Sequence, residues 1–479
     1  MRFKNTLFLL LILLSTNYSF TQEYFDDLGP EFHKKKRQEF RSLMPANSVA
    51  FIFTSPIMKR SNDTDYMYHQ DPNFYYLTGW REPHGVLVIF KDDQFDSDGS
   101  YNEIMYVRER NEYREMWDGR RLGIKGAKKM SFDRVKLRSE FIENTIPIEN
   151  FSNILNTNIR DDVRDFKDDK YDLFDIQNKF QEIVSKKESD ILGDLNKQFF
   201  SSSINQIMSK LRQTKDPLEI ELLTKAIRIS ALAQIEVMRA IHNDMTEREV
   251  QGIHEFIYRK YGAAHEGYNS IVGAGGNACV LHYVTNEDMD IKDKLILMDV
   301  GAEYRGYTAD VTRTIPVNGK FNNEQKIIYD LVYKSQEEAI KEAIIGNSFN
   351  DIYLKSYDII AKGLIDLGII NDYSEARKYY PHGVSHHIGL DVHDPGSRDL
   401  MENMVITVEP GIYIPENSNT DPKWWNIGIR IEDDVLITND GPVNLSAGAP
   451  RDLKDIEELM KEESALKDFI LPEINSLVQ

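Results

Sequence analysis

The chain reads Leu295-Ile296-Leu297-Met298-Asp299-Val300-Gly301 and, after a short link, Tyr307-Thr308-Ala309-Asp310-Val311-Thr312-Arg313. Both runs are predicted strands, and Glu303-Tyr304-Arg305-Gly306 between them is a natural turn. A hairpin centred on that turn would place Asp299 opposite Asp310, with the two side chains on one face and their Cβ atoms about 5 Å apart. Two carboxylates that face each other between apolar strands repel and raise each other's pKa unless a cation lies between them. The hairpin therefore predicts a metal site.

A second pair of apolar runs repeats this arrangement in Val405-Ile406-Thr407-Val408-Glu409-Pro410-Gly411 and Ile427-Gly428-Ile429-Arg430-Ile431-Glu432-Asp433-Asp434-Val435. Glu409 and Glu432 each lie within or at the end of a predicted strand. The proline and glycine after Glu409 indicate that its strand ends or bulges there. Arg430 precedes Glu432 by two residues, so both side chains share one face, where an arginine can orient a metal-binding carboxylate.

Histidines gather between these two pairs, in the segment His382-Gly383-Val384-Ser385-His386-His387-Ile388-Gly389-Leu390-Asp391-Val392-His393-Asp394. Four of the chain's 11 histidines fall within residues 382–393. Imidazole is the usual nitrogen ligand of divalent ions, so this density predicts a functional segment. His282 is a weaker candidate taken alone. The glycines at 273–276 before it do not lead clearly into a helix, which argues against a phosphate-binding loop.

The charge of this constellation favours two metal ions over one. Four carboxylates and one neutral imidazole carry a charge of -4, which two divalent cations balance. A ligand set dominated by oxygen with one nitrogen suits Mn²⁺, with Co²⁺ or Zn²⁺ as alternatives. Two such ions can lower the pKa of a bridging water and polarise a carbonyl together, so the sequence predicts hydrolysis of an amide or an ester.

Bulk composition limits the partners of the chain. Its 479 residues are 41% hydrophobic, enough for two or three domains, and its formal charge of -20 repels phosphate backbones, so we expect no nucleic-acid partner. Cys279 is the only cysteine, which excludes a disulfide within the chain. It lies in an apolar run and is interpreted as a buried hydrophobe rather than as a nucleophile.

The N-terminus has the order of a signal peptide, predicted over residues 1–21. Arg2 and Lys4 precede the apolar run 7–14, and Ser19-Phe20-Thr21 offers a cleavage site. The apolar run is far shorter than the roughly 20 residues of a membrane-spanning helix, so we expect export to the periplasm or the medium, with no membrane span in the mature protein. The alternative is a buried N-terminal strand or helix.

The predicted domains are a mixed α/β domain over residues 22–205, a second domain over 206–455 and a tail over 456–479 that reads as a surface helix. Residues 49–53 and 85–90 are predicted buried strands. The charged stretch 186–210 is interpreted as a helical connection, and Asp216 and Pro217 as the start of the first helix of the second domain.

The order Asp, Asp, His, Glu, Glu in these settings resembles the pita-bread metallopeptidases and, within them, the aminopeptidase P family. Tyr75-Tyr76-Leu77-Thr78-Gly79-Trp80 and Trp117-Asp118-Gly119-Arg120-Arg121-Leu122-Gly123 are similar to that family's N-terminal domain, and residues 215–455 to its catalytic domain. The resemblance implies an α+β protein in which a mixed α/β domain precedes a pita-bread catalytic domain. It implies a metalloaminopeptidase that hydrolyses the Xaa-Pro bond at the N-terminus of peptides with proline in second position.

The resemblance also assigns roles to individual residues. A hydroxide bridging the two metal ions would attack the scissile carbonyl, and Glu409 would shuttle its proton to the leaving nitrogen. His282 and His393 would position the substrate and stabilise the tetrahedral intermediate, while His382 would border the proline pocket and Arg430 would support the ligands. The implied metal ligands are Asp299, Asp310, His386, Glu409 and Glu432, with Asp310 and Glu432 bridging the ions.

Members of this family are often dimers or tetramers in which a neighbouring subunit lines the site, so we expect a homo-oligomer. The aromatic cluster at residues 74–80 is a candidate for that surface, and plain packing within the N-terminal domain is the alternative. The nearest rival function is that of a prolidase, which cleaves only Xaa-Pro dipeptides. Creatinase-like hydrolases lack the metals, methionine aminopeptidases lack the large N-terminal domain, and a catalytically inactive peptide-binding module would typically have lost ligands that are intact here.

Overall fold

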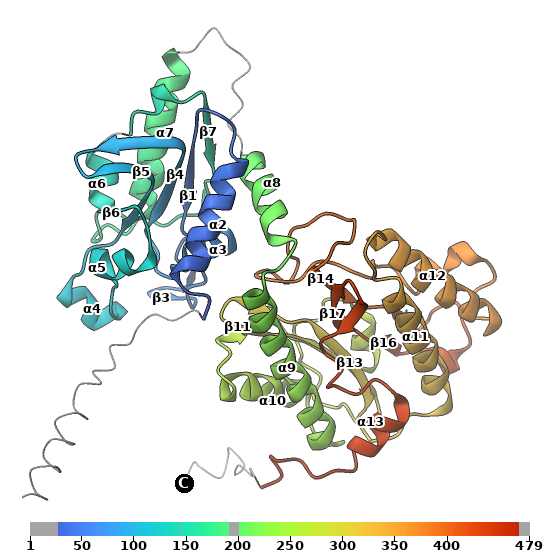
Figure 1. The fold of residues 1–479 in the computed structure, drawn as a ribbon. Helices are drawn as coiled ribbons and strands as arrows, with labels where there is room; N and C mark the ends of the chain where they lie inside the picture. Colours follow the sequence, from blue (N-terminus) through green and yellow to red (C-terminus); the bar gives the residue numbers. More distant parts are fainter. Residues whose placement is uncertain (1–26, 145, 191–200, 469–479) are drawn as a thin grey trace, which may run out of the picture.

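A computed structural model describes residues 27–144, 146–190 and 201–468 (Figure 1). The predicted signal peptide and residues 469–479 of the predicted tail lie outside this range. Within it, no helix combines the length and the apolar composition needed to cross a bilayer.

The N-terminal domain is built on a mixed sheet in the order β6-β5-β4-β1-β7, in which β1 pairs antiparallel with β4 and parallel with β7. Both predicted strands are confirmed, and β4 runs to Asp96, beyond the predicted end. The elements are α2 (Pro30–Leu43), β1 (Ser48–Phe53), β2 (Lys59–Ser61), β3 (Thr64–Asp65), α3 (Pro72–Thr78), β4 (Val86–Asp96), β5 (Gly99–Val107), α4 (Glu112–Asp118), α5 (Gly123–Ala127), β6 (Arg134–Leu137), α6 (Arg138–Glu143), β7 (Asn153–Asn156) and α7 (Leu173–Asp190).

Helices cover both faces of this sheet, and the alternation of side chains along β1 shows why. Phe51 and Phe53 belong to a core that contains Phe141 of α6 and Phe180 of α7. Ile52 points the other way, into a core that contains residues of α2 and α3. Because successive side chains of a strand face opposite sides, a run of consecutive apolar residues is the pattern of a strand buried on both faces.

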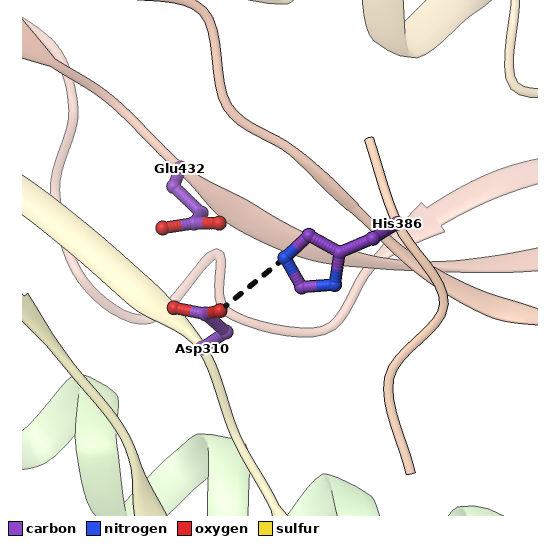
Figure 2. A group of neighbouring side chains, drawn as sticks. All are labelled: Asp310, His386 and Glu432. Carbon is purple, nitrogen blue, oxygen red and sulfur yellow. Dashed lines mark ion pairs between the residues drawn. The ribbon is translucent and has the colours of Figure 1, made fainter. Parts of the chain in front are cut away.

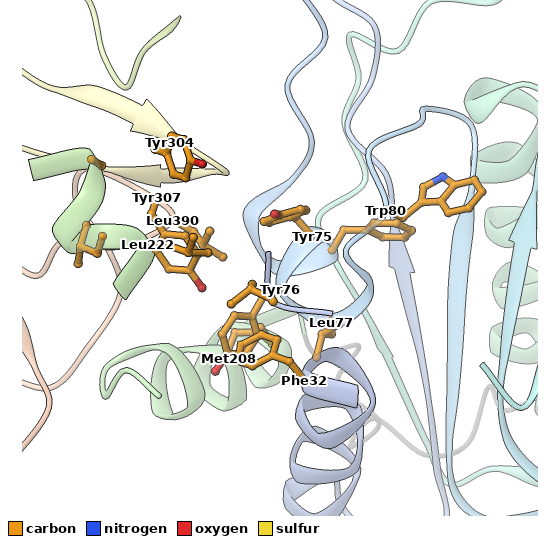
Figure 3. Packing of buried hydrophobic residues seen from close by; sticks show 14 of the residues in the cluster. Phe32, Tyr75, Tyr76, Leu77, Trp80, Met208, Leu222, Tyr304, Tyr307 and Leu390 are labelled. Carbon is orange, nitrogen blue, oxygen red and sulfur yellow. The ribbon is translucent and has the colours of Figure 1, made fainter. Parts of the chain in front are cut away.

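The aromatic cluster lies on α3 and is buried between the two domains (Figure 3). The Tyr75 hydroxyl donates to the carbonyl of Arg305 at 2.9 Å, and the Tyr76 hydroxyl donates to that of Leu211 at 2.9 Å. Trp80 is fully buried. The expectation that residues 74–80 form a surface for a neighbouring subunit is therefore wrong, because these rings are already buried within the chain.

The connection between the domains is helical where the structure describes it. Helix α8 (Ser201–Arg212) contains the predicted boundary at 205/206, and α9 (Pro217–Ala240) begins at the predicted proline. The backbone N–H of Asp216 donates to a Glu219 carboxylate oxygen at 2.9 Å, which fixes the first turn of α9. Residues 191–200 of the predicted connection lie outside the described range.

The catalytic domain combines small antiparallel sheets with helices packed on their outer side (Figure 1). The sheets have the orders β13-β10-β9, β12-β11-β8, β14-β17-β18 and β15-β16. The elements are α10 (Glu247–Lys260), β8 (His265–Glu266), β9 (Ile271–Ala274), β10 (Leu295–Val300), β11 (Ala302–Tyr304), β12 (Tyr307–Thr308), β13 (Val311–Pro316), α11 (Asn323–Lys341), α12 (Phe349–Asp366), β14 (Val405–Val408), β15 (Gly411–Ile414), β16 (Ile427–Arg430), β17 (Asp433–Thr438), β18 (Gly441–Asn444) and α13 (Leu453–Leu459).

The first acidic hairpin forms, but its register differs from the predicted one. Asp299 of β10 is paired with Thr312 of β13, not with Asp310. The turn consists of Arg305 and Gly306, with φ values of 54° and 90°, rather than four residues. Two left-handed turn residues match the twist of a hairpin and shift the pairing by two positions. A shift of two preserves the face, so Asp310 becomes the diagonal neighbour of Asp299.

The second acidic hairpin breaks at its two glutamates. Val408 pairs with Asp433 on one side of the break, and Gly411 pairs with Arg430 on the other. The same register continued across the break places Glu409 opposite Glu432. The predicted end of the strand at Glu409 is confirmed, and Ile431 and Glu432 interrupt the partner strand in the same way.

Candidate metal centre and substrate cavity

All nine residues singled out from the sequence line one cavity of about 480 Å³ in the catalytic domain. They come from four separate parts of the chain, which the two acidic hairpins and the histidine segment bring together. They are Asp299, Asp310, His282, His382, His386, His393, Glu409, Arg430 and Glu432.

The two aspartates share a hydroxyl donor. The Tyr268 hydroxyl oxygen lies 2.6 Å from Oδ1 of Asp299 and 2.5 Å from Oδ1 of Asp310, so both carboxylates point to one place despite the shifted register. The other oxygen of Asp299 accepts a hydrogen bond from Nη2 of Arg430 at 2.5 Å. Arg430 and the Tyr268 hydroxyl thereby hold the Asp299 carboxylate in one orientation.

Thr312 links the two hairpins. Its hydroxyl donates to Oε2 of Glu432 at 2.5 Å and accepts from Nε of Arg430 at 3.4 Å. Arg430 also donates to the Tyr413 hydroxyl at 2.8 Å. The prediction that Arg430 and Glu432 share a face is confirmed, and the guanidinium spans from Thr312 to Asp299.

His386 completes the group from the segment between the hairpins. Its Nε2 lies 3.5 Å from Oδ2 of Asp310 (Figure 2). The same atom lies 3.6 Å from Oε1 of Glu409. One ligand atom each of Asp310, His386 and Glu432 lies within 4.8 Å of the others. A cation could contact all three after small side-chain adjustments.

Burial of so much negative charge shifts the pKa values in the site. Burial, together with the charges of its carboxylate neighbours, raises the pKa of Glu432 well above its ordinary value. Burial also raises the pKa of Asp299, against the opposing charge of Arg430, and that of Glu409 to about 7. Burial would lower the pKa of His386, but Asp310 and Glu409 outweigh it and raise that pKa to about 9. Three of the four carboxyl groups therefore hold a proton more readily than free carboxyl groups do, whereas His386 outweighs burial and lowers the pKa of Asp310.

The residues present fit a pair of divalent cations. Among the described residues, the four carboxylates contact one permanent cation, Arg430, and one conditional cation, His386. His382 lies 3.8 Å from Glu409, but burial lowers its pKa to about 4, so it contributes no charge near neutral pH. Buried carboxylates are normally paired or bound to metal, and this oxygen-rich donor set suits a hard or borderline ion.

The remaining predicted histidines occupy different parts of the cavity. His282 and His393 are exposed to it, and the His393 ring packs edge-on against His386 with centroids 4.3 Å apart. Nε2 of His382 is 2.8 Å from the Tyr413 hydroxyl. His387, the fourth histidine of the segment, lies outside the cavity, where its Nε2 contacts the carbonyl of Ser397 at 2.7 Å.

Three residues of the site were missed by the sequence reasoning. Thr312 follows Asp310 by two and therefore shares its face, a signal that could have been used. Tyr413 lies in β15, beyond the predicted run 405–411, and an aromatic residue there suggests packing as readily as contact with a ligand. Tyr268 precedes β9, and nothing in its neighbourhood marks it.

Comparisons with known proteins agree with this site. The model of metallopeptidase family M24 matches residues 221–439, and that of the aminopeptidase P N-terminal domain matches residues 33–159. Xaa-Pro aminopeptidase of Haemophilus influenzae is 35% identical over 447 residues, 90% of this chain and 97% of the relative. Xaa-Pro aminopeptidase of Escherichia coli is 36% identical over 455 residues, 91% and 98%. The structure of E. coli aminopeptidase P with the inhibitor Pro-Leu superposes with a TM-score of 0.79 at 34% identity, covering 90% of this chain and 98% of that one.

A pita-bread domain with a buried carboxylate and histidine site, behind a mixed N-terminal domain, defines a peptidase of metallopeptidase family M24. Within it, the chain belongs to the aminopeptidase P family, since both of that family's domains are present and the likeness extends over nine-tenths of the sequence.

Proposed function

We propose that this protein is an Xaa-Pro aminopeptidase that releases the N-terminal residue from peptides with proline in second position. The observation that carries the proposal is the convergence of four carboxylates, three of them buried and that of Glu409 half-buried, and of His386 in one cavity. The named activity of relatives that match almost the whole chain supports the specificity.

In this proposal Asp299, Asp310, His386, Glu409 and Glu432 hold two divalent cations, with Mn²⁺ favoured by the donor set. When bound, the cations supply a water of lowered pKa and polarise the scissile carbonyl. The chain's own residues do the rest. The Glu409 carboxylate carries a proton to the leaving nitrogen.

Substrate recognition is assigned to the rest of the cavity. His282 and His393 face the open cavity and would position the peptide, while His382, fixed against Tyr413, borders the proline ring. A prolyl nitrogen in a peptide bond has no hydrogen to donate, so its site must be read by shape, and apolar walls serve that purpose. Leu281 and Val392 provide such walls.

Export and assembly are part of the proposal. The N-terminal pattern of residues 1–21 supports export, with peptides from the surroundings as substrates. For a homo-oligomer, the exposed apolar side chains of α4 replace the buried cluster at 74–80 as the candidate contact surface. Met116 and Trp117 are 76% and 73% exposed, which is unusual for side chains of this size.

The test is hydrolysis of Arg-Pro-Pro and of the dipeptide Arg-Pro, each with Mn²⁺ and with chelator. Release of arginine from the tripeptide, abolished by chelator, is the expected result. Cleavage of the dipeptide alone would replace the proposal with a prolidase, and no cleavage of either peptide would overturn it. Asp310→Asn should abolish both metal loading and turnover, and near-normal activity of that variant would contradict the ligand assignment.

A further inference from the structure

The connection between the domains contacts the segment that carries His393 and holds it in place. Arg212, the last residue of α8, is 3% exposed. Its guanidinium donates to Oδ2 of Asp391 at 2.7 Å and also to a carboxylate oxygen of Asp394. Nζ of Lys215 donates to the other oxygen of Asp394 at 3.0 Å. Two cationic side chains of the connection, those of Arg212 and Lys215, therefore bind Asp394, the residue next to His393.

The contacts of the connection extend to both domains. Nη1 of Arg212 donates to the Asn73 side chain of α3 at 2.7 Å, and the Lys215 backbone N–H donates to the carbonyl of Asn403 at 2.8 Å. Gln213 accepts from the backbone N–H of Ser397 at 3.0 Å. The connection thus contacts the N-terminal domain on one side and residues 391–403 on the other.

The geometry leaves Asp394 little freedom. Its backbone N–H donates to the carbonyl of His387 at 3.0 Å, and a Cβ at Gly389 would lie 2.6 Å from one of its carboxylate oxygens. Burial disfavours the charged carboxylate, but Arg212 and Lys215 hold the pKa of Asp394 below its ordinary value, so the group is ionised near neutral pH. A buried ionised group with two cationic partners is fixed in position, because moving it would separate buried charges.

We infer that Arg212 and Lys215 are positioning residues, which act through Asp394 to set the place of His393 against His386 in the substrate cavity. The inference rests on the proposed function for the role of His393, and on the contacts above for the fixed position of Asp394. It makes the connection between the domains part of the catalytic machinery. Neither cation lines the cavity that holds the candidate metal ligands.

The test compares Arg212→Met with Lys36→Met. Lys36 is a matched control because it is also a buried cation between the domains, paired with Asp216 at 3.2 Å and with Glu219 at 3.7 Å at the start of α9. Both variants lose an ion pair between the domains, but only Arg212→Met loosens Asp394. We expect Arg212→Met to lower kcat/KM by about 10- to 100-fold, as small misplacements of catalytic groups do, and to keep the wild-type metal content. Lys36→Met should stay within about two-fold of wild type.

A double-mutant cycle decides whether Arg212 acts through His393. In a His393→Ala background, Arg212→Met should cause no further loss. Losses that multiply, a loss of metal, or an equal loss in Lys36→Met would each overturn the inference. If Arg212→Met does not fold, Lys215→Met, which removes one contact from Asp394, replaces it in the same cycle.

A second readout does not depend on activity. In metal-free protein labelled on its histidine rings, the His393 resonance, assigned with His393→Ala, should shift or broaden in Arg212→Met and stay in place in Lys36→Met. An unchanged resonance in Arg212→Met overturns the inference. If the wild type fails to cleave Xaa-Pro peptides while this resonance moves, the proposed function has failed and the positioning of His393 stands.

Discussion

Glu432 offers the sharpest test of the metal centre, because neutralising it should have opposite effects with and without metal. One of its carboxylate oxygens lies within 4.8 Å of a carboxylate oxygen of Asp310. Two charges at that separation repel by about 3.5 kcal/mol at an effective dielectric constant near 20. Proton uptake relieves part of this cost, as the raised pKa of Glu432 shows. We therefore expect Glu432→Gln to stabilise the metal-free protein by about 1–3 kcal/mol.

The assay is thermal unfolding in chelator and in saturating Mn²⁺. A gain near 2 kcal/mol corresponds to a rise in Tm of about 4–8 °C for domains of this size. The Thr312 hydroxyl can donate to the new amide oxygen, so shape and hydrogen bond are kept. In Mn²⁺ the order should reverse, since metal bound at 100 times its Kd stabilises the wild type by about 2.7 kcal/mol and the variant has lost a ligand.

The neighbouring residue supplies the matched control. Asp433 is as fully buried as Glu432, but it accepts hydrogen bonds from Arg313 at 2.7 Å and pairs with Arg451 at 3.2 Å. Asp433→Asn takes the carboxylate away from the buried guanidinium of Arg313 and should cost about 3–5 kcal/mol with or without metal. If Glu432→Gln also lowered the stability of the chelated protein, the idea that repulsion between the carboxylates destabilises the protein without metal would be refuted.

Two further predictions concern the stability of the fold. A Cβ at Gly301 would lie 1.7 Å from the carbonyl oxygen of Ala309, so Gly301→Ala should lower the free energy of unfolding by roughly 3 kcal/mol and remove most of the activity. The control is Gly252→Ala, in open space on helix α10. It should stabilise the protein by about 0.5–1 kcal/mol in thermal unfolding. Burial lowers the pKa of His254 from 6.5 to about 4, so the folded state binds fewer protons and stability falls as pH drops from 6.5 to 4, by about 3 kcal/mol from this residue. Denaturant titrations should show a smaller fall for His254→Leu, and an unchanged fall would refute the assignment.

Much of the candidate site could be read from the sequence because its residues break local patterns. Asp299 and Glu432 are charges inside apolar runs of the sequence, and a fold tolerates such charges only where something compensates them. The density of histidines in 382–393 pointed to the segment between the hairpins. Local pattern alone also gave the buried strands β1 and β4 and the start of α9.

The features that the sequence did not reveal depend on contacts between distant segments. The hairpin register turned on whether Arg305 and Gly306 alone, or four residues, form the turn, and both readings fit the same letters. The burial of residues 74–80 depends on where the catalytic domain lies. Tyr268 contacts the two aspartates only because β9 pairs with β10, and no periodicity in the sequence predicts that pairing.

The two acidic hairpins are tied together at the candidate ligands themselves. The backbone N–H of Asp310 donates to the side chain of Asp434 at 3.1 Å, and that of Glu432 donates to the carbonyl of Thr312 at 3.1 Å. Each hairpin thus satisfies a backbone group of the other at a place where the strands are interrupted, as buried donors require. Carboxylates on backbones fixed in this way cannot separate when positive charge is missing. When no cation is bound, carboxylates held in these positions therefore repel one another. That repulsion is the quantity that Glu432→Gln lowers.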